Sequence, residues 1–114
     1  MLLYTNHPLG EFMKMYKQVT CQDGFSISIQ AGSGKYCSPR NDEGPYIEVE
    51  LGFPNRKELL IHSYAEDRDD PTGTVYGYVP STIVLEMLLK HGGMNSGTIP
   101  PMIMGHSNNY LDEY

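Results

Sequence analysis

Three arginines and several tyrosines are the residues whose types best suit the binding of a ligand. The chain has only three arginines, Arg40, Arg56 and Arg68, alongside nine tyrosines. A guanidinium binds phosphate through two parallel N–H donors, and a tyrosine ring offers a flat face on which a base can stack. We therefore predict a site for a small anionic, nucleotide-like ligand formed by Arg40, Tyr36, Arg56, Tyr76 and Tyr78.

Each arginine has an alternative role in an ion pair with a neighbouring carboxylate. Arg68 lies between Asp67 and Asp69, so this pairing fits it better than ligand binding does. Arg40 follows Pro39, which stiffens the approach to it. For Arg40 both roles stay open.

The sequence lacks the local patterns of common catalytic centres. It has no GxSxG, no P-loop and no GxGxxG between a strand and a helix, and residues 32–35 (Gly-Ser-Gly-Lys) lack the spacing of a phosphate loop. Glu48 and Glu50 share one strand face, which is typical of a solvated surface. Cys37 has no base nearby in the sequence to activate it as a nucleophile. We therefore expect no catalytic residues, no cofactor and no enzymatic activity.

The histidines and cysteines are candidates for a metal site. Cys21 and Cys37 have fifteen residues between them and do not form a CxxC pair. A zinc site that joins both to His62 or His91 is one alternative. We favour buried, reduced cysteines and structural or helix-capping histidines, and therefore predict no metal.

Composition limits the class of partner. The formal net charge is −6, which argues against direct binding to nucleic acid but permits a small anion held by local arginines, or a basic protein. The 114 residues suffice for one domain with a modest core, so a deep pocket is more readily built between the subunits of a homo-oligomer. No run of residues has the length of a membrane span, and the first residues do not resemble a secretion signal. We expect a cytoplasmic protein.

The hydrophobic pattern predicts an α+β fold, with a small antiparallel sheet, one longer C-terminal helix and one short helix. Alternation predicts a half-buried strand at 25–30, paired with the preceding strand through an Asp23-Gly24 turn. It also predicts that Ile47, Val49 and Leu51 point inward. The expected strands are 15–21, 25–30, 35–37, 46–53 and 74–79, and the expected helices are 55–64 and 82–91.

The two helices have different signals. Asn55 and Glu58 have the spacing of a capping box at the start of the short helix. The long helix is apolar on most of its surface, so it should pack on the sheet or at a subunit contact, and Gly92-Gly93 should end it. We expect three regions: a loose N-terminal arm (1–14), the α+β domain (15–93) and an extended or flexible C-terminal tail (94–114).

Several consecutive phrases resemble small proteins of phage and prophage genomes, over residues 16–93 and about two thirds of the chain. These phrases are Cys21-Gln22-Asp23-Gly24-Phe25-Ser26, Tyr36-Cys37-Ser38-Pro39-Arg40, Gly44-Pro45-Tyr46, Gly52-Phe53-Pro54, Tyr64-Ala65-Glu66-Asp67, Thr74-Val75-Tyr76-Gly77-Tyr78-Val79-Pro80 and His91-Gly92-Gly93. Among such proteins the sequence is most similar to the phage anti-Thoeris sponges. The resemblance implies an α+β oligomer that captures a cyclic ADP-ribose signal without cleaving it, in the cytosol of the host cell. No ligand residue of that family is transferred to a position in this chain.

Three functional hypotheses follow. The first is a phage-encoded, non-enzymatic protein that sequesters a small nucleotide immune signal and so blocks host antiviral defence. The second is an acidic protein inhibitor of a nucleic-acid-binding defence complex, similar to some anti-CRISPR proteins, which the charge of −6 and the outward Glu48 and Glu50 favour. The third is a small hydrolase that destroys the signal.

Overall fold

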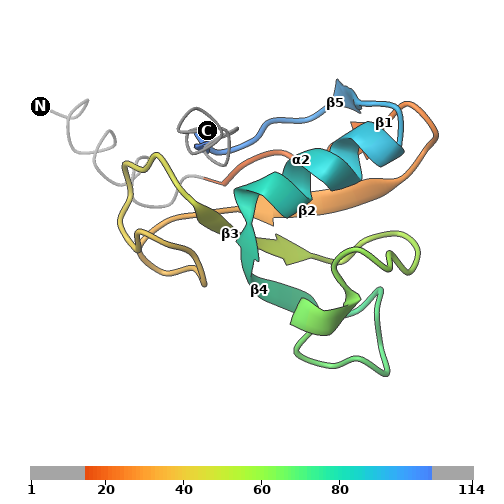
Figure 1. Cartoon of the computed structure of the whole chain (residues 1–114), viewed down its shortest axis with the longest axis horizontal. Helices are drawn as coiled ribbons and strands as arrows, with labels where there is room; N and C mark the ends of the chain where they lie inside the picture. Colours follow the sequence, from red (N-terminus) through yellow and green to blue (C-terminus); the bar gives the residue numbers. More distant parts are fainter. Residues whose placement is uncertain (1–14, 104–114) are drawn as a thin grey trace, which may run out of the picture.

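A computed structural model describes residues 15–103 of the chain (Figure 1). Five strands form one sheet in the order β4-β3-β2-β1-β5, and all neighbouring strands are antiparallel. This confirms the predicted small α+β fold with an antiparallel sheet. The elements are β1 (Val19–Cys21), β2 (Ser26–Gln30), β3 (Glu48–Gly52), the 3₁₀ turn η1 (His62–Tyr64), β4 (Val75–Pro80), α2 (Ser81–Lys90) and β5 (Met94–Ser96).

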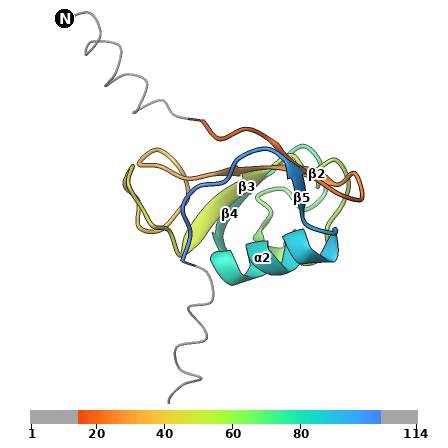
Figure 2. The ribbon, with the colours of Figure 1, turned by 90° about the horizontal axis from the view of Figure 1, so that it is seen from above.

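Helix α2 lies along one face of the sheet and closes the core (Figure 2). Val84 and Met87 of α2 are fully buried against side chains from the strands. Alternating residues of a strand point to opposite faces of the sheet. The side chains that this alternation predicted to point inward are buried, with one exception. The core includes Phe25, Ile27, Ile29, Val49 and Leu51, all 0% exposed.

Ile47 departs from the predicted alternation, because its side chain is 45% exposed. The carbonyl of Ser38 accepts hydrogen bonds from the backbone amides of both Ile47 and Glu48, at 2.8 and 3.2 Å. Two residues therefore face one residue of the partner segment, which is the pattern of a β-bulge. The bulge shifts the phase of the chain, so Ile47 turns outward although Val49 and Leu51 point inward.

The predicted short helix is much shorter than residues 55–64. Only η1 is helical, and it is a three-residue 3₁₀ turn. Asn55 does not cap it, since its side chain accepts a hydrogen bond from the Ser26 amide and donates one to the Gly24 carbonyl. The strand predicted at 35–37 is also absent from the described region, where only an isolated bridge joins Ser38 to Glu48.

The C-terminal segment belongs to the fold beyond residue 93, where we expected the domain to end. Strand β5 pairs with β1. Further along the chain, Met102 forms an isolated parallel bridge with Tyr46. The Tyr46 amide donates to the Pro101 carbonyl, and the Ile103 amide donates to the Tyr46 carbonyl. The proposed arm 1–14 and residues 104–114 of the tail lie outside the described residues. In the described part of the chain, no helix is both long and apolar enough to cross a membrane.

Candidate ligand-binding site

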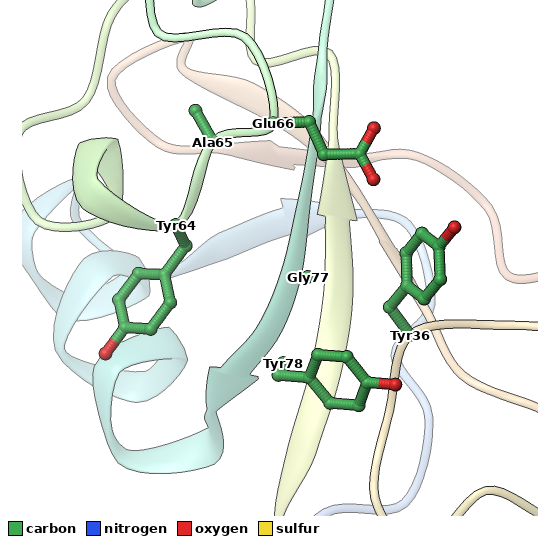
Figure 3. Close-up of a pocket in the computed structure, with 6 residues that line it drawn as sticks. All are labelled: Tyr36, Tyr64, Ala65, Glu66, Gly77 and Tyr78. Atoms are coloured by element: carbon green, nitrogen blue, oxygen red, sulfur yellow. The ribbon is translucent and has the colours of Figure 1, made fainter.

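A hollow of about 280 Å³ opens beside β4. Three tyrosines and one carboxylate surround it, and the backbone of Gly77 lies between them (Figure 3). The volume is near the lower end of ligand pockets, and the rim is open to solvent. The lining residues are Tyr36, Tyr64, Ala65, Glu66, Gly77 and Tyr78.

A second β-bulge places Tyr78 at the hollow. In the pairing of β3 with β4, Val49 lies opposite Val79 and Leu51 lies opposite Tyr76, so β4 contains one extra residue. Tyr76 and Val79 therefore both point into the core, and Tyr78 turns outward. Tyr78 has φ of +53°, a left-handed conformation that is rare for a large side chain.

The loop that carries Tyr36 is anchored on this bulge. The backbone amide of Tyr78 donates to the Tyr36 carbonyl at 3.0 Å. Because of the bulge this amide does not pair with β3, and the loop supplies its acceptor instead. The Tyr36 amide donates to Glu50 at 2.9 Å. A Cβ on Gly77 would lie 3.2 Å from the Cβ of Tyr36, which is a tight contact, so the close approach of the loop favours glycine there.

The structure brings together three of the five predicted ligand residues. The rings of Tyr36 and Tyr78 have their centroids 6.0 Å apart, and the guanidinium carbon of Arg40 lies 5.7 Å from the centroid of Tyr36. In residues 15–103 Arg40 makes no ion pair with a carboxylate. Its contact with the ring is a cation–π interaction. Arg40 is not one of the residues that line the hollow, but its charge remains available to an anion bound beside Tyr36.

The other two predicted residues lie elsewhere. Tyr76 is 0% exposed, and its hydroxyl donates to the Pro71 carbonyl at 2.5 Å. Burial, with a smaller effect of Asp70, raises the pKa of Tyr76 above its ordinary value. Arg56 pairs with Asp23 at 3.0 Å, away from the lining residues. Neither can contact a ligand in the hollow. Arg68 donates to the Ser63 carbonyl, and no carboxylate of the described region pairs with it.

The sequence predicted arginines at the ligand site, but no arginine or lysine is among the residues that line the hollow, and the one charged lining residue is Glu66. The Glu66 carboxylate is exposed and has no hydrogen-bond partner among the described residues. Such a group repels phosphate but accepts hydrogen bonds from ribose hydroxyls or an exocyclic amine. The arrangement therefore suits a ligand with an aromatic face, a donor group near Glu66 and a negative charge near Arg40. Its lining contains no nucleophile paired with a base.

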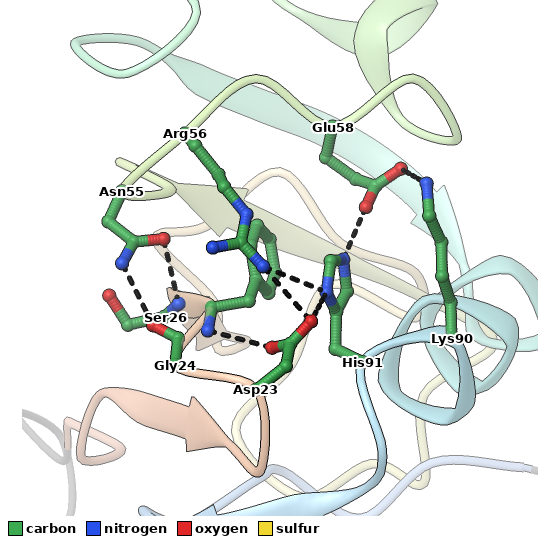
Figure 4. Close-up of polar contacts among 9 residues, drawn as sticks. Asp23, Gly24, Ser26, Asn55, Arg56, Glu58, Lys90 and His91 are labelled. Carbon is green, nitrogen blue, oxygen red and sulfur yellow. Dashed lines mark hydrogen bonds and ion pairs between the residues drawn. The ribbon is translucent and has the colours of Figure 1, made fainter.

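A second cluster, which the sequence did not reveal, surrounds His91 (Figure 4). Its ring nitrogens contact two carboxylates: Nδ1 lies 2.7 Å from Asp23 Oδ2, and Nε2 lies 2.5 Å from Glu58 Oε1. Lys90 Nζ lies 2.7 Å from the other oxygen of Glu58, and Arg56 contacts Asp23. The ring also stacks on Phe25, with centroids 4.0 Å apart. We call these five charged residues the His91 cluster.

The charges of the His91 cluster are mutually consistent. Only a doubly protonated imidazole can donate hydrogen bonds to carboxylates through both nitrogens. The pKa of Asp23 is below its ordinary value, chiefly because His91 donates to the carboxylate and also because the Phe25 amide does. Burial pushes the pKa of Glu58 upward, but hydrogen bonds from the Leu60 amide, Lys90 and His91 outweigh it and lower the pKa overall. We therefore describe the cluster with both carboxylates ionised and His91 as a cation.

The His91 cluster does not have the geometry of a catalytic site. The His91 side chain is only 7% exposed, and both ring nitrogens are engaged by carboxylates. General acid–base catalysis needs a ring nitrogen within reach of the substrate. Cys21 and Cys37 are both buried, as expected for structural thiols. In residues 15–103 no group of three or more metal-ligating side chains converges.

Comparison of the chain with protein-family models, with curated proteins and with solved structures finds no match. The fold and the hollow thus describe a small α+β protein with an open, tyrosine-lined surface site.

Proposed function

We propose that this protein is a non-enzymatic binding protein that captures a small, nucleotide-like ligand in the hollow beside β4. The observation that carries the proposal is that Tyr36 and Arg40, which contact each other within one loop, meet Tyr78 of the distant strand β4 through the ring of Tyr36. The strained backbone of Tyr78 supports it, because strain of this kind is concentrated at functional sites.

In this proposal each part of the hollow contacts a different part of the ligand. The tyrosine rings cover the base, and Arg40 neutralises the phosphate. Glu66 accepts hydrogen bonds from ribose hydroxyls or the base. The resemblance to anti-Thoeris sponges suggests a cyclic ADP-ribose type of signal. A phage-encoded protein that binds it tightly would lower its free concentration in the host cytosol and so block antiviral defence.

The open rim supports the further proposal of a homo-oligomer. Ligand pockets generally bury most of the ligand surface. Tyr36 and Tyr78 remain 41% and 42% exposed, so this hollow covers a ligand from one side. A second subunit is the simplest source of the other wall.

Ligand-induced thermal stabilisation tests the proposal. We expect cyclic ADP-ribose isomers to raise Tm, because a ligand that binds only the folded state stabilises it. Tyr36→Ala and Arg40→Ala should each weaken binding by roughly 5- to 150-fold, since base stacking and charged hydrogen bonds contribute about 1–3 kcal/mol each. Lys57→Ala, which removes an exposed charge elsewhere, is the control.

Two outcomes of this experiment would change the assignment. If Arg40→Ala and Lys57→Ala bind equally well, the hollow beside β4 is not the site. If the compound recovered after heat denaturation is a cleavage product and not the intact ligand, the protein is a hydrolase and not a sponge.

The acidic inhibitor is the second candidate, and one surface feature favours it. Four exposed carboxylates follow one another closely, at Glu66, Asp67, Asp69 and Asp70, within a chain of net charge −6. A protein of this kind would bind a basic nucleic-acid-binding surface with an affinity that falls steeply with salt. It would show no thermal shift with the nucleotide.

A further inference from the structure

The His91 cluster joins two parts of the fold that are far apart in the sequence. Backbone hydrogen bonds already connect them: the Gln22 amide donates to the Gly93 carbonyl, and the Asp23 amide donates to the His91 carbonyl. The carboxylate of Asp23 adds a contact in the opposite direction, because it accepts from Nδ1 of His91. The β1–β2 turn is thus held to the C-terminal end of α2 by both backbone and side chain.

The two ring nitrogens of His91 have unequal surroundings. Nε2 faces Glu58, whose side chain is 1% exposed and also binds Lys90 and the Leu60 amide. Nδ1 faces Asp23, whose side chain is 42% exposed. Loss of the Nε2 proton would leave a lone pair against a buried carboxylate, which is costly. The Nδ1 proton is the one with access to water.

A second donor lies ready beside Nδ1. Nη2 of Arg56 is 3.4 Å from Nδ1 and 3.0 Å from the same Asp23 oxygen. While Nδ1 carries a proton, it and Arg56 both donate to Asp23. Once Nδ1 is deprotonated, its lone pair can accept a hydrogen bond from Arg56, whereas it would repel the carboxylate.

We propose that the His91 cluster is a proton-operated switch, in which release of the Nδ1 proton to water transfers Nδ1 from Asp23 to Arg56 and loosens the β1–β2 turn. The Nε2–H···Glu58 bond persists in both states, so the ring stays in place on Phe25. The charged groups that act on His91 are Asp23 and Glu58, which favour the cation, and Arg56 and Lys90, which oppose it. The buried thiol of Cys21 lies on the adjoining strand; burial and Asp23 raise its pKa. This inference does not depend on the hollow beside β4.

NMR on the full chain tests the switch. Long-range ¹H–¹⁵N spectra report which ring nitrogen of His91 carries a proton as the pH is raised. We expect Nδ1 to lose its proton while Nε2 keeps it. At the same transition, exchange of the Gln22 and Asp23 amides should accelerate about tenfold beyond the intrinsic effect of pH, which is the scale of losing one charged hydrogen bond. The proposal is overturned if Nε2 deprotonates first, or if His91 titrates without any change in exchange of these amides.

Two variants complete the test. Asp23→Asn presents both an acceptor and a donor to Nδ1, so it can bind either state and should abolish the step in amide exchange without unfolding the protein. His62→Gln, at the other histidine of the described region, should leave the step unchanged. If Asp23→Asn shows the full step in amide exchange, loss of the hydrogen bond between His91 and Asp23 does not cause the step, and the proposal is overturned.

Discussion

Substitutions at Tyr78 separate the backbone strain of the β4 bulge from the role of the tyrosine ring. Tyr78 has φ of +53°, where a residue with a Cβ is disfavoured and glycine is not. Glycine within a strand usually makes a protein less stable than alanine does. We predict the reverse at this position: Tyr78→Gly should be more stable than Tyr78→Ala.

The size of the difference follows from two opposing contributions. The left-handed backbone costs a residue with a Cβ about 1–2 kcal/mol. Glycine loses more backbone entropy on folding than alanine, which costs about 0.5–1 kcal/mol. The loss of ring contacts is common to both variants and cancels. The two ranges give a difference between about 0 and 1.5 kcal/mol. The glycine variant should therefore be more stable by about 0.75 kcal/mol at the centre of this range, or roughly 3–6 °C in Tm for a domain of this size.

Phe53 provides a matched control for this experiment. It also has a left-handed backbone, with φ of +51°, and its side chain is 53% exposed, but it does not line the hollow. Urea unfolding of glycine and alanine variants at both positions should give the same order of stability. Only the Tyr78 variants should lose ligand-induced stabilisation. Equal or greater stability of Tyr78→Ala over Tyr78→Gly would refute the strained bulge.

Three further predictions concern the rest of the fold. A Cβ on Gly97 would clash with the carbonyl oxygen of Gln18, whereas one on Gly93 meets nothing within 4 Å. In urea unfolding Gly97→Ala should therefore destabilise more than Gly93→Ala, and equal losses would contradict the close approach of Gly97 to Gln18. Glu58→Gln removes the buried carboxylate that lies between His91 and Lys90, and it should lower the free energy of unfolding by about 2–4 kcal/mol. Glu86→Gln, on the exposed side of α2, is the control and should change the free energy of unfolding little. Since folding lowers the pKa of both Asp23 and Glu58, their stabilisation is present above the ordinary carboxyl range and is lost as the pH falls through their folded-state pKa values. Urea titrations from neutral to acidic pH should show this loss, and Glu58→Gln should reduce it.

The sheet and the long helix could be predicted because their signals are local. Phe25, Ile27 and Ile29 alternate with polar residues, and the Asp23-Gly24 turn fixes the hairpin. Helix α2 has a continuous apolar pattern, and the left-handed Gly92 follows its end. Each signal lies within about ten residues, so the sequence is sufficient.

The composition of the site could be predicted only in part, because two β-bulges break the strand period. Strict alternation puts Tyr76 and Tyr78 on the same face, and both were candidate ligand residues. The extra residue in β4 instead buries Tyr76 and exposes Tyr78. No feature of residues 74–80 marks the bulge except Gly77, which alone is a weak signal.

The His91 cluster was missed for a different reason. Its carboxylates are 68 and 33 residues away from His91, so only the tertiary fold joins them. Asn55 and Glu58 have the spacing of a helix cap, but both side chains have partners in distant segments. Local capping signals therefore predicted a helix where tertiary hydrogen bonds determine the structure.

The loop that carries Tyr36 is hydrogen-bonded to both bulges. Its Tyr36 carbonyl accepts from the amide of Tyr78 at the β4 bulge, and its Ser38 carbonyl accepts from the amide of Ile47 at the β3 bulge. One short loop thus satisfies backbone groups that both bulges would otherwise leave unpaired. The outward turns of Tyr78 and Ile47 and the position of Tyr36 are therefore coupled, and the hollow forms where the loop binds the edge of the sheet. A change that detaches this loop should therefore displace the side chains of Tyr36, Tyr78 and Ile47 together, although no two of them are neighbours in the sequence.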